Sequence, residues 1–116
     1  PTLAQKAEIT QNAIDVARGL GIVRPRVAVL ASNENVNPRI PANVDAAALS
    51  KMADRKQITG ALVDGPLALD NAISRDAAID KEIDSQVAGR ADLLILPDIE
   101  AANGIVHAID SVLLPD

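Results

Sequence analysis

Residues that could bind a ligand or exchange protons gather directly after one apolar run of the sequence. Carboxylates can orient a substrate or act as acids and bases, and amides and hydroxyls bind polar groups of ligands. Two interpretations are open here: the rim of a working site, or an ordinary turn between a strand and a helix. The residues concerned are Asp64, Gly65, Pro66, Asp70, Asn71 and Ser74.

Each of these residues also has an interpretation without a ligand. Asp64 either orients a substrate or caps the helix that follows through its carboxylate. We expect Gly65 to adopt a positive φ or to allow a close backbone approach. Asp70 and Ser74 are spaced to share one face of a helix. That face either binds polar groups in a cleft or is solvated.

Other kinds of site have weaker support. His107 is the only histidine, and no serine or aspartate stands near it at a spacing that suggests a triad. The residue types and spacing of a metal site are also missing from the sequence. The glycines of "GLGIVRP" precede an apolar run instead of following one, which is the wrong context for a phosphate loop. Arg39, Arg75 and Arg90 could meet an anion or be ordinary surface charges.

The composition limits the class of protein. The 116 residues include 16 acidic and 11 basic side chains, no aromatic residue and no cysteine. Without a basic cluster or aromatic platforms, we expect no nucleic-acid partner. No apolar run is long enough to span a bilayer, and no signal peptide is visible, so we expect a cytoplasmic protein without a membrane partner. The chain begins at Pro1 within a helical pattern, and we therefore expect a piece of a longer protein.

The periodicity of apolar residues predicts alternating helices and strands. A loop with two prolines, Pro38 and Pro41, is expected over 33–44, and Pro66 is expected to begin a helix. From Ile105 onward a helix is favoured, with Ile109 and Leu113 on its apolar face, although Asn103-Gly104 could instead be a hairpin turn into a strand. The helices are expected at about 3–18, 45–55, 66–73 and 74–83, with Ser74 as a cap, and the strands at 26–32, 58–65 and 91–98.

Apolar strands that alternate with helices indicate right-handed crossovers and a parallel sheet. The predicted fold is α/β: one three-layer αβα unit of residues 1–116 with a short parallel sheet of about three strands. Ligands of such sheets bind outside the carboxyl ends of the strands. The loops expected there are Ser32–Glu34, Asp64–Pro66 and Pro97–Asp98.

Two segments, "ITGALVDGPLALDNAIS" and "VAGRADLLILPDIEAAN", resemble the phosphate acetyltransferase/phosphate butyryltransferase family. The upstream run that begins "QNAIDVARGLGIVRPRVAVLAS" resembles it too. The similarity extends from residue 1 to about 103 and is strongest to the acyltransferase portion of bifunctional enoyl-CoA hydratase/phosphate acetyltransferases. It implies a chain that is part of one lobe of a larger two-lobed enzyme, which usually forms a homodimer. It also implies reversible acyl transfer between acyl-CoA and phosphate, with coenzyme A as a substrate and no bound cofactor.

The resemblance assigns candidate positions to the wall of a substrate cleft. Its catalytic Ser-Arg motif matches no segment of this chain, so we expect the isolated chain to be inactive and assign no catalytic residue. Three departures affect the match: Ala102 and His107 replace a usual glycine and lysine, and Glu82 replaces a glycine. The candidate cleft residues are Asp64, Gly65, Pro66, Asp70, Asn71, Ser74, Asp98 and Asn103, with Pro97 beside them.

Two alternatives accompany this interpretation. The chain could be a non-catalytic α/β module, excised or designed, whose role is structural. The tail "NGIVHAIDSVLLP" also resembles the closing segment of fasciclin-like adhesion domains, in which this run is a strand. That second resemblance covers only residues 103–115.

Overall fold

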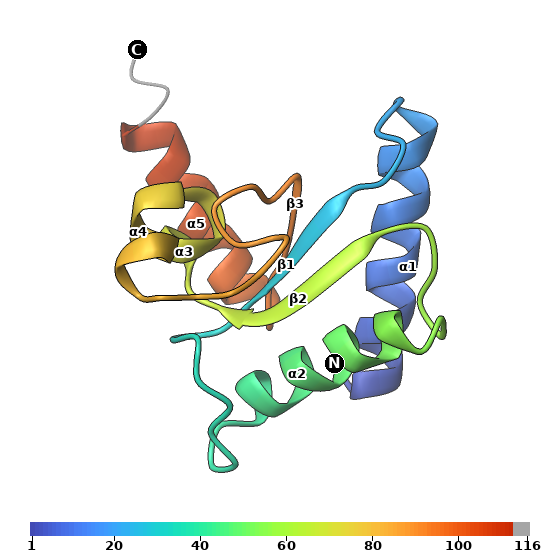
Figure 1. Ribbon diagram of the computed structural model, residues 1–116, viewed down its shortest axis with the longest axis horizontal. Coiled ribbons are helices and arrows are strands. Elements are labelled where there is room, and N and C mark those ends of the chain that lie inside the picture. Colours follow the sequence, from blue (N-terminus) through green and yellow to red (C-terminus); the bar gives the residue numbers. More distant parts are fainter. Residues whose placement is uncertain (113–116) are drawn as a thin grey trace.

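The chain folds as a parallel sheet between two layers of helices (Figure 1). The computed structural model describes the backbone of residues 1–112 and the side chains of residues 1–106. The three strands within this range are β1 (Arg26–Leu30), β2 (Leu62–Leu67) and β3 (Leu93–Ile95). The helices are α1 (Leu3–Gly19), α2 (Pro41–Asp54), α3 (Leu69–Ile73), α4 (Arg75–Asp80) and α5 (Ile99–Val112). The predicted α/β class and the parallel three-stranded sheet are thus confirmed.

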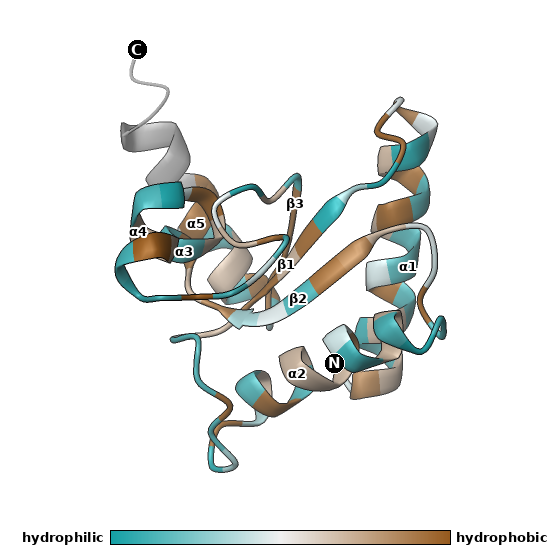
Figure 2. Ribbon diagram, in the orientation of Figure 1, coloured by the Kyte–Doolittle hydropathy of each residue, from teal (hydrophilic) through white to brown (hydrophobic). Residues whose placement is uncertain are grey.

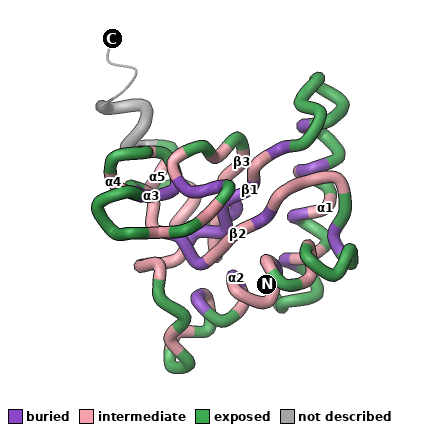
Figure 3. The backbone as a smooth tube through the Cα atoms, in the orientation of Figure 1, coloured by how far each residue is buried: buried purple, intermediate pink, exposed green. Residues whose placement is uncertain are grey.

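Strand β1 lies in the middle of the sheet, in the order β2-β1-β3, and pairs in parallel with both neighbours. Because side chains alternate between the faces of a strand, β1 supplies both halves of the core. Val27 and Val29 enter one apolar cluster, and Ala28 and Leu30 enter the other. Figure 3 shows buried positions concentrated along this strand, and Figure 2 shows its apolar character.

Helices α1 and α2 cover one face of the sheet. Ile14 of α1 and Leu49 of α2 are fully buried against Val27, Val29 and the other members of this cluster. A capping box begins α1, since the Thr2 hydroxyl accepts from the Gln5 N–H at 3.1 Å and the Gln5 carboxamide accepts from the Thr2 N–H at 2.8 Å.

Helices α3, α4 and α5 cover the other face, around Leu30 and Leu67. The Ser74 hydroxyl accepts from the Ala77 N–H at 3.2 Å and caps α4, as predicted. Gly89 packs so tightly on the start of α4 that a β-carbon there would lie 2.6 Å from the Arg75 Cα. This close approach, together with a φ of +76° at Gly89, requires glycine in the "VAG" segment.

The prediction that residues 33–44 form only a loop was wrong, because α2 begins at Pro41 and not at Asp45. Proline is tolerated in the first turn of a helix, since the N–H that it lacks has no partner inside the helix. Pro38 lies before the helix, in the loop as predicted.

The prediction that Pro66 begins a helix was also wrong. Strand β2 continues through a cis Gly65–Pro66 bond to Leu67, which pairs with Leu30. Between the pairs Ala28–Asp64 and Leu30–Leu67 the register shifts, so that β2 carries one residue more than β1. Pro66 occupies this bulge, where no N–H is needed for the ladder. Helix α3 therefore starts only at Leu69.

The remaining predicted elements are correct in type: α1 matches its predicted range to within one residue, β1 ends at Leu30 and not at residue 32, and β2 begins only at Leu62. The strand expected over 91–98 is reduced to β3, and the helix expected over 74–83 ends at Asp80. The tail is a helix through Val112, so the strand alternative at Asn103-Gly104 was wrong, and with it the fasciclin-like arrangement. Leu113 lies outside the described residues.

Candidate functional site

The carboxyl ends of the three parallel strands lie at one edge of the sheet (Figure 1), which we call the carboxyl edge. The segment after β1 passes there, α3 follows β2, and α5 follows β3. Of the three predicted strand-end loops, Ser32–Glu34 and Pro97–Asp98 lie at this edge, but Asp64–Pro66 is part of β2 itself, so the turn into α3 comes later, at Ala68. Whether these loops form a binding site is a separate question, which depends on the side chains that they carry.

Four side chains from three separate segments meet at this edge, and we call them the edge cluster: Glu34, Asp70, Asn71 and Lys81. The Lys81 Nζ lies 3.1 Å from the Asp70 Oδ2 and 3.7 Å from the Glu34 Oε2. The Asn71 Nδ2 donates to the Glu34 Oε2 at 3.4 Å. Of the predicted site residues, the structure thus brings Asp70 and Asn71 together with two residues whose role the sequence did not reveal.

The ion pair in the edge cluster sets the charge states of its members. The hydrogen bond from Lys81 holds the pKa of the Asp70 carboxyl below its ordinary value, and the Asn71 N–H supports this with a 2.8 Å bond to the Asp70 Oδ1. In return, the hydrogen bond with Asp70 raises the pKa of the Lys81 amine. Both groups are therefore charged at neutral pH, and neither is poised to exchange a proton there.

A second buried amide fixes the segment that carries Glu34. Asn43, in the first turns of α2, has no exposed surface, and its Nδ2 donates to the Asn33 Oδ1 at 2.9 Å and to the Asn35 carbonyl at 2.6 Å. Among the described residues, the side-chain oxygens of Asn43 and Asn71 are buried without a hydrogen-bond partner. The sequence pattern gave no sign of this role, because an asparagine in a polar helix start is common.

Asp64 does not cap a helix, which corrects one of the two interpretations given to it. Its Oδ1 accepts from the N–H of Gly65 at 2.9 Å, and helix α3 begins after Ala68 without a side-chain cap. Gly65 has no positive φ, but a β-carbon there would lie 2.8 Å from the Val29 carbonyl oxygen. The close-approach form of the prediction for Gly65 is therefore confirmed. Pro66 is buried and cannot line a cleft.

The other predicted residues have local structural partners or none. Ser74 is occupied by the cap of α4, so Asp70 and Ser74 serve different purposes despite their spacing. The Asp98 Oδ1 accepts from the Ala101 N–H at 2.7 Å at the start of α5. Asn103 is exposed on the same helix, beside the half-buried Ala102. The side chain of His107 lies outside the described residues.

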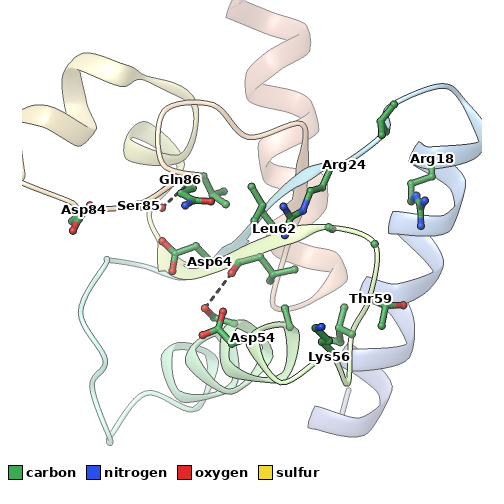
Figure 4. A pocket seen from close by; sticks show the side chains of 18 residues that line it. Arg18, Arg24, Asp54, Lys56, Thr59, Leu62, Asp64, Asp84, Ser85 and Gln86 are labelled. Carbon is green, nitrogen blue, oxygen red and sulfur yellow. Dashed lines mark hydrogen bonds between the residues drawn. The ribbon is translucent and has the colours of Figure 1, made fainter.

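A hollow of about 750 Å³ follows the outer edge of β2 (Figure 4). Basic side chains stand at the end where β2 begins, and acidic and polar ones stand toward its carboxyl end. The sequence does not reveal this hollow, because its lining comes from segments that lie far apart in the chain. Its labelled residues are Arg18, Arg24, Asp54, Lys56, Thr59, Leu62, Asp64, Asp84, Ser85 and Gln86.

The exposed edge of β2 is partly covered within the chain itself. The Ser50 hydroxyl donates to the Val63 carbonyl at 3.2 Å, and the Asp64 carboxylate accepts from the Gly65 N–H. Both contacts use backbone groups that an added strand would need. Of the predicted site residues only Asp64 lines this hollow.

Within the described part of the chain, no set of three metal-ligating side chains is grouped. In this same part of the chain, no helix is both long and apolar enough to cross a membrane. The arrangement thus defines a class: an α/β lobe with a polar carboxyl edge that offers carboxylate and amide groups and one paired ammonium.

Comparison with known proteins assigns the family. Residues 1–111 match the family model "Phosphate acetyl/butaryl transferase", and the chain belongs to that family. It is 52% identical over 109 residues to the phosphate acetyltransferase of Thermotoga maritima, covering 94% of this chain and 37% of that protein. It is 48% identical over 103 residues to the phosphate butyryltransferase of Clostridium acetobutylicum, covering 89% of this chain and 34% of that protein. The resemblance noted in the sequence is therefore confirmed.

The fold agrees with a solved structure of the same kind. A branched-chain phosphotransacylase from Enterococcus faecalis superposes with a TM-score of 0.89 at 36% identity, over 97% of this chain and 40% of that chain. This chain thus spans about a third of the length of the curated relatives given above.

Proposed function

We propose that this chain forms one wall of the acyl-transfer cleft in a phosphate acyltransferase that uses acyl-CoA and phosphate, or acyl phosphate, as substrates. The observation that carries the proposal is the family match, which extends over residues 1–111. The carboxyl edge is the part of this wall that we assign to substrate contact, because open α/β sheets bind ligands there. The contact residues that we propose are Asp70, Asp98 and Asn103, with the buried Asn71 and with Asp64, Gly65, Pro66 and Ser74 shaping the edge behind them.

The chemistry of the family explains what this wall can supply. In acyl transfer to coenzyme A, the thiolate sulfur forms a bond to the carbonyl carbon of the acyl phosphate, and phosphate leaves with the bridging oxygen. The reaction needs a base for the thiol and cationic groups for the phosphate. At the carboxyl edge the one ammonium, Lys81, is already paired with two carboxylates, Asp70 and Glu34. We assign to this edge the binding and orientation of coenzyme A, and we assign no residue in the described part of the chain to the chemical step.

Two measurements on the isolated chain test this proposal. The first mixes the chain with acetyl phosphate and coenzyme A and follows thioester absorbance, for which we expect no rate above that of buffer. The second is a calorimetric titration with coenzyme A, for which we expect saturable binding. Asp98→Ala, at the edge, should weaken that binding, whereas Glu8→Gln on the exposed surface of α1 should not.

The outcomes separate the proposal from its alternatives. Absence of binding to coenzyme A would favour a structural module that keeps the fold without the ligand site. Formation of acetyl-CoA would show that the chain holds catalytic groups that we have not identified.

We further propose a cytoplasmic location and a homodimer for the protein that carries this lobe. The cytoplasmic location is supported by the lack of cysteine, which is compatible with a reducing compartment.

A further inference from the structure

Lys81 joins three segments of the chain at the carboxyl edge. It follows α4, and its ammonium reaches Asp70 of α3 at 3.1 Å and Glu34, in the loop after β1, at 3.7 Å. Glu34 is only 26% exposed at its side chain, so its charge is partly removed from water and needs a partner nearby. Without Lys81, the carboxylates of Glu34 and Asp70 would face the same space without a compensating charge.

Asn71 holds the same loop from the interior. It has no exposed surface, its backbone carbonyl accepts from the Gly89 N–H at 2.8 Å, and its Nδ2 donates to the Glu34 Oε2. The amide is therefore fixed on one side by the "VAG" segment and presents its donor to the loop on the other. Glu34 therefore contacts a buried neutral donor, Asn71, on one side and a partly exposed cation, Lys81, on the other.

We propose that Lys81 and Asn71 are positioning residues that hold the loop 33–37 in a single arrangement at the carboxyl edge, ready to meet a ligand. The consequence for coenzyme A rests on the function proposed above. A loop that is already ordered loses less conformational entropy when a ligand binds, so binding is tighter. Lys81 acts through Glu34 and not through contact with the ligand, which distinguishes it from a residue of the binding surface.

The direct test is hydrogen exchange of the loop amides in the isolated chain. The Asn35 N–H donates to the Asn33 Oδ1 at 3.0 Å, so its exchange requires this hydrogen bond within the loop to break. In Lys81→Met we expect this amide to exchange about two- to fivefold faster, the range expected when an exposed ion pair is lost. The matched control is Lys51→Met, which removes an exposed ion pair with Asp54 on α2 and should leave the loop unchanged.

Two further measurements separate positioning from general stability. The urea midpoint of Lys81→Met should fall only slightly, as expected when an exposed ion pair is lost, and Lys81→Arg, which keeps the cation, should restore slow exchange of the loop. Equal loop exchange in the wild-type chain and in Lys81→Met would overturn the proposal, and so would a faster exchange that spreads evenly over the whole sheet.

Titration with coenzyme A distinguishes this proposal from the one on which it rests. If the wild-type chain binds coenzyme A, Lys81→Met should bind it about two- to fivefold more weakly, and an unchanged affinity would contradict the positioning role. If the wild-type chain binds no coenzyme A, the proposed function fails at this edge. The exchange measurement would still decide whether Lys81 and Asn71 position the loop.

Discussion

Gly65 offers a sharp test of the packing behind the carboxyl edge. A β-carbon at this position would lie 2.8 Å from the Val29 carbonyl oxygen, 3.0 Å from the Val29 Cβ and 3.2 Å from the Ala46 Cβ. The nearest of these atoms belongs to the backbone of the central strand, which cannot swing aside as the tip of a side chain can. Gly65→Ala must therefore push β2 away from β1 or move α2.

The expected cost follows from two opposing contributions. Extra volume in a close-packed core costs about 1–3 kcal/mol of unfolding free energy. Replacing glycine by alanine also restricts the unfolded chain, which returns about 0.4–1 kcal/mol where the backbone conformation suits alanine. Gly65 has no positive φ, so this gain applies. We expect a net loss of about 1–2 kcal/mol.

Urea unfolding of the purified variants measures this loss. The midpoint of Gly65→Ala should fall by about 1 M, and the melting temperature should fall by about 4 °C for each kcal/mol lost. Gly19→Ala is the matched control, because nothing lies within 4 Å of a β-carbon at the end of α1, and it should unfold at the same or a slightly higher urea concentration. A Gly65→Ala midpoint at or above that of the wild-type chain would refute the close approach of β2 to Val29.

Two further predictions concern charged groups. Lys6→Met should lower the unfolding free energy by about 2–4 kcal/mol, because it leaves the Asp45 carboxylate, 25% exposed and 2.9 Å from the Lys6 Nζ, without its partner. Lys51→Met, which breaks the exposed pair with Asp54, should cost less than about 1 kcal/mol. Equal losses in the two variants would contradict the argument that burial makes the Lys6 pair more important. Asp70 and Lys81 should stabilise the fold in a defined pH range. Since Lys81 holds the pKa of Asp70 below its ordinary 3.8, that contribution is complete above 3.8 and is lost as pH falls through the lowered pKa. It should likewise be complete below 10.5, the ordinary pKa of lysine, and be lost as pH rises through the raised pKa of Lys81. Melting temperatures of the wild-type chain and Asp70→Asn should therefore differ at pH 6 and converge at low pH, and a difference that grows on acidification would contradict the pairing.

The layer architecture could be predicted from local patterns in the sequence. The apolar runs that became β1 and β3 carry no charged side chain in their interiors, and the capping box at Thr2 marks the start of α1. The predictions were wrong at two prolines, because a proline can either begin a helix or lie in a strand bulge. Pro41 is the first residue of a helix and Pro66 lies in a strand bulge, and only the pairing of Leu30 with Leu67 decides the second case.

The side-chain arrangement at the site was less predictable than the backbone. The polar character of the turn after β2 could be predicted from the sequence. The ion pair of Asp70 with Lys81, and the contact of Lys81 with Glu34, could not. Such pairs depend on how three loops cross one edge, and no spacing along the chain encodes that crossing. The role of Asn43 was equally unpredictable, because its hydrogen-bond partners lie in the loop before α2 and not in the helix itself.

The most direct measurement is a map of backbone amide chemical shifts during titration of the isolated chain with coenzyme A. A binding wall at the carboxyl edge predicts saturable shifts at the loop 33–37, at Asp70 and Asn71, and at the start of α5. Lys6, Thr10 and the rest of α1 should stay unchanged. Shifts confined to the hollow beside β2, or no shifts at coenzyme A concentrations that saturate full-length relatives, would contradict the assignment of this edge to substrate binding.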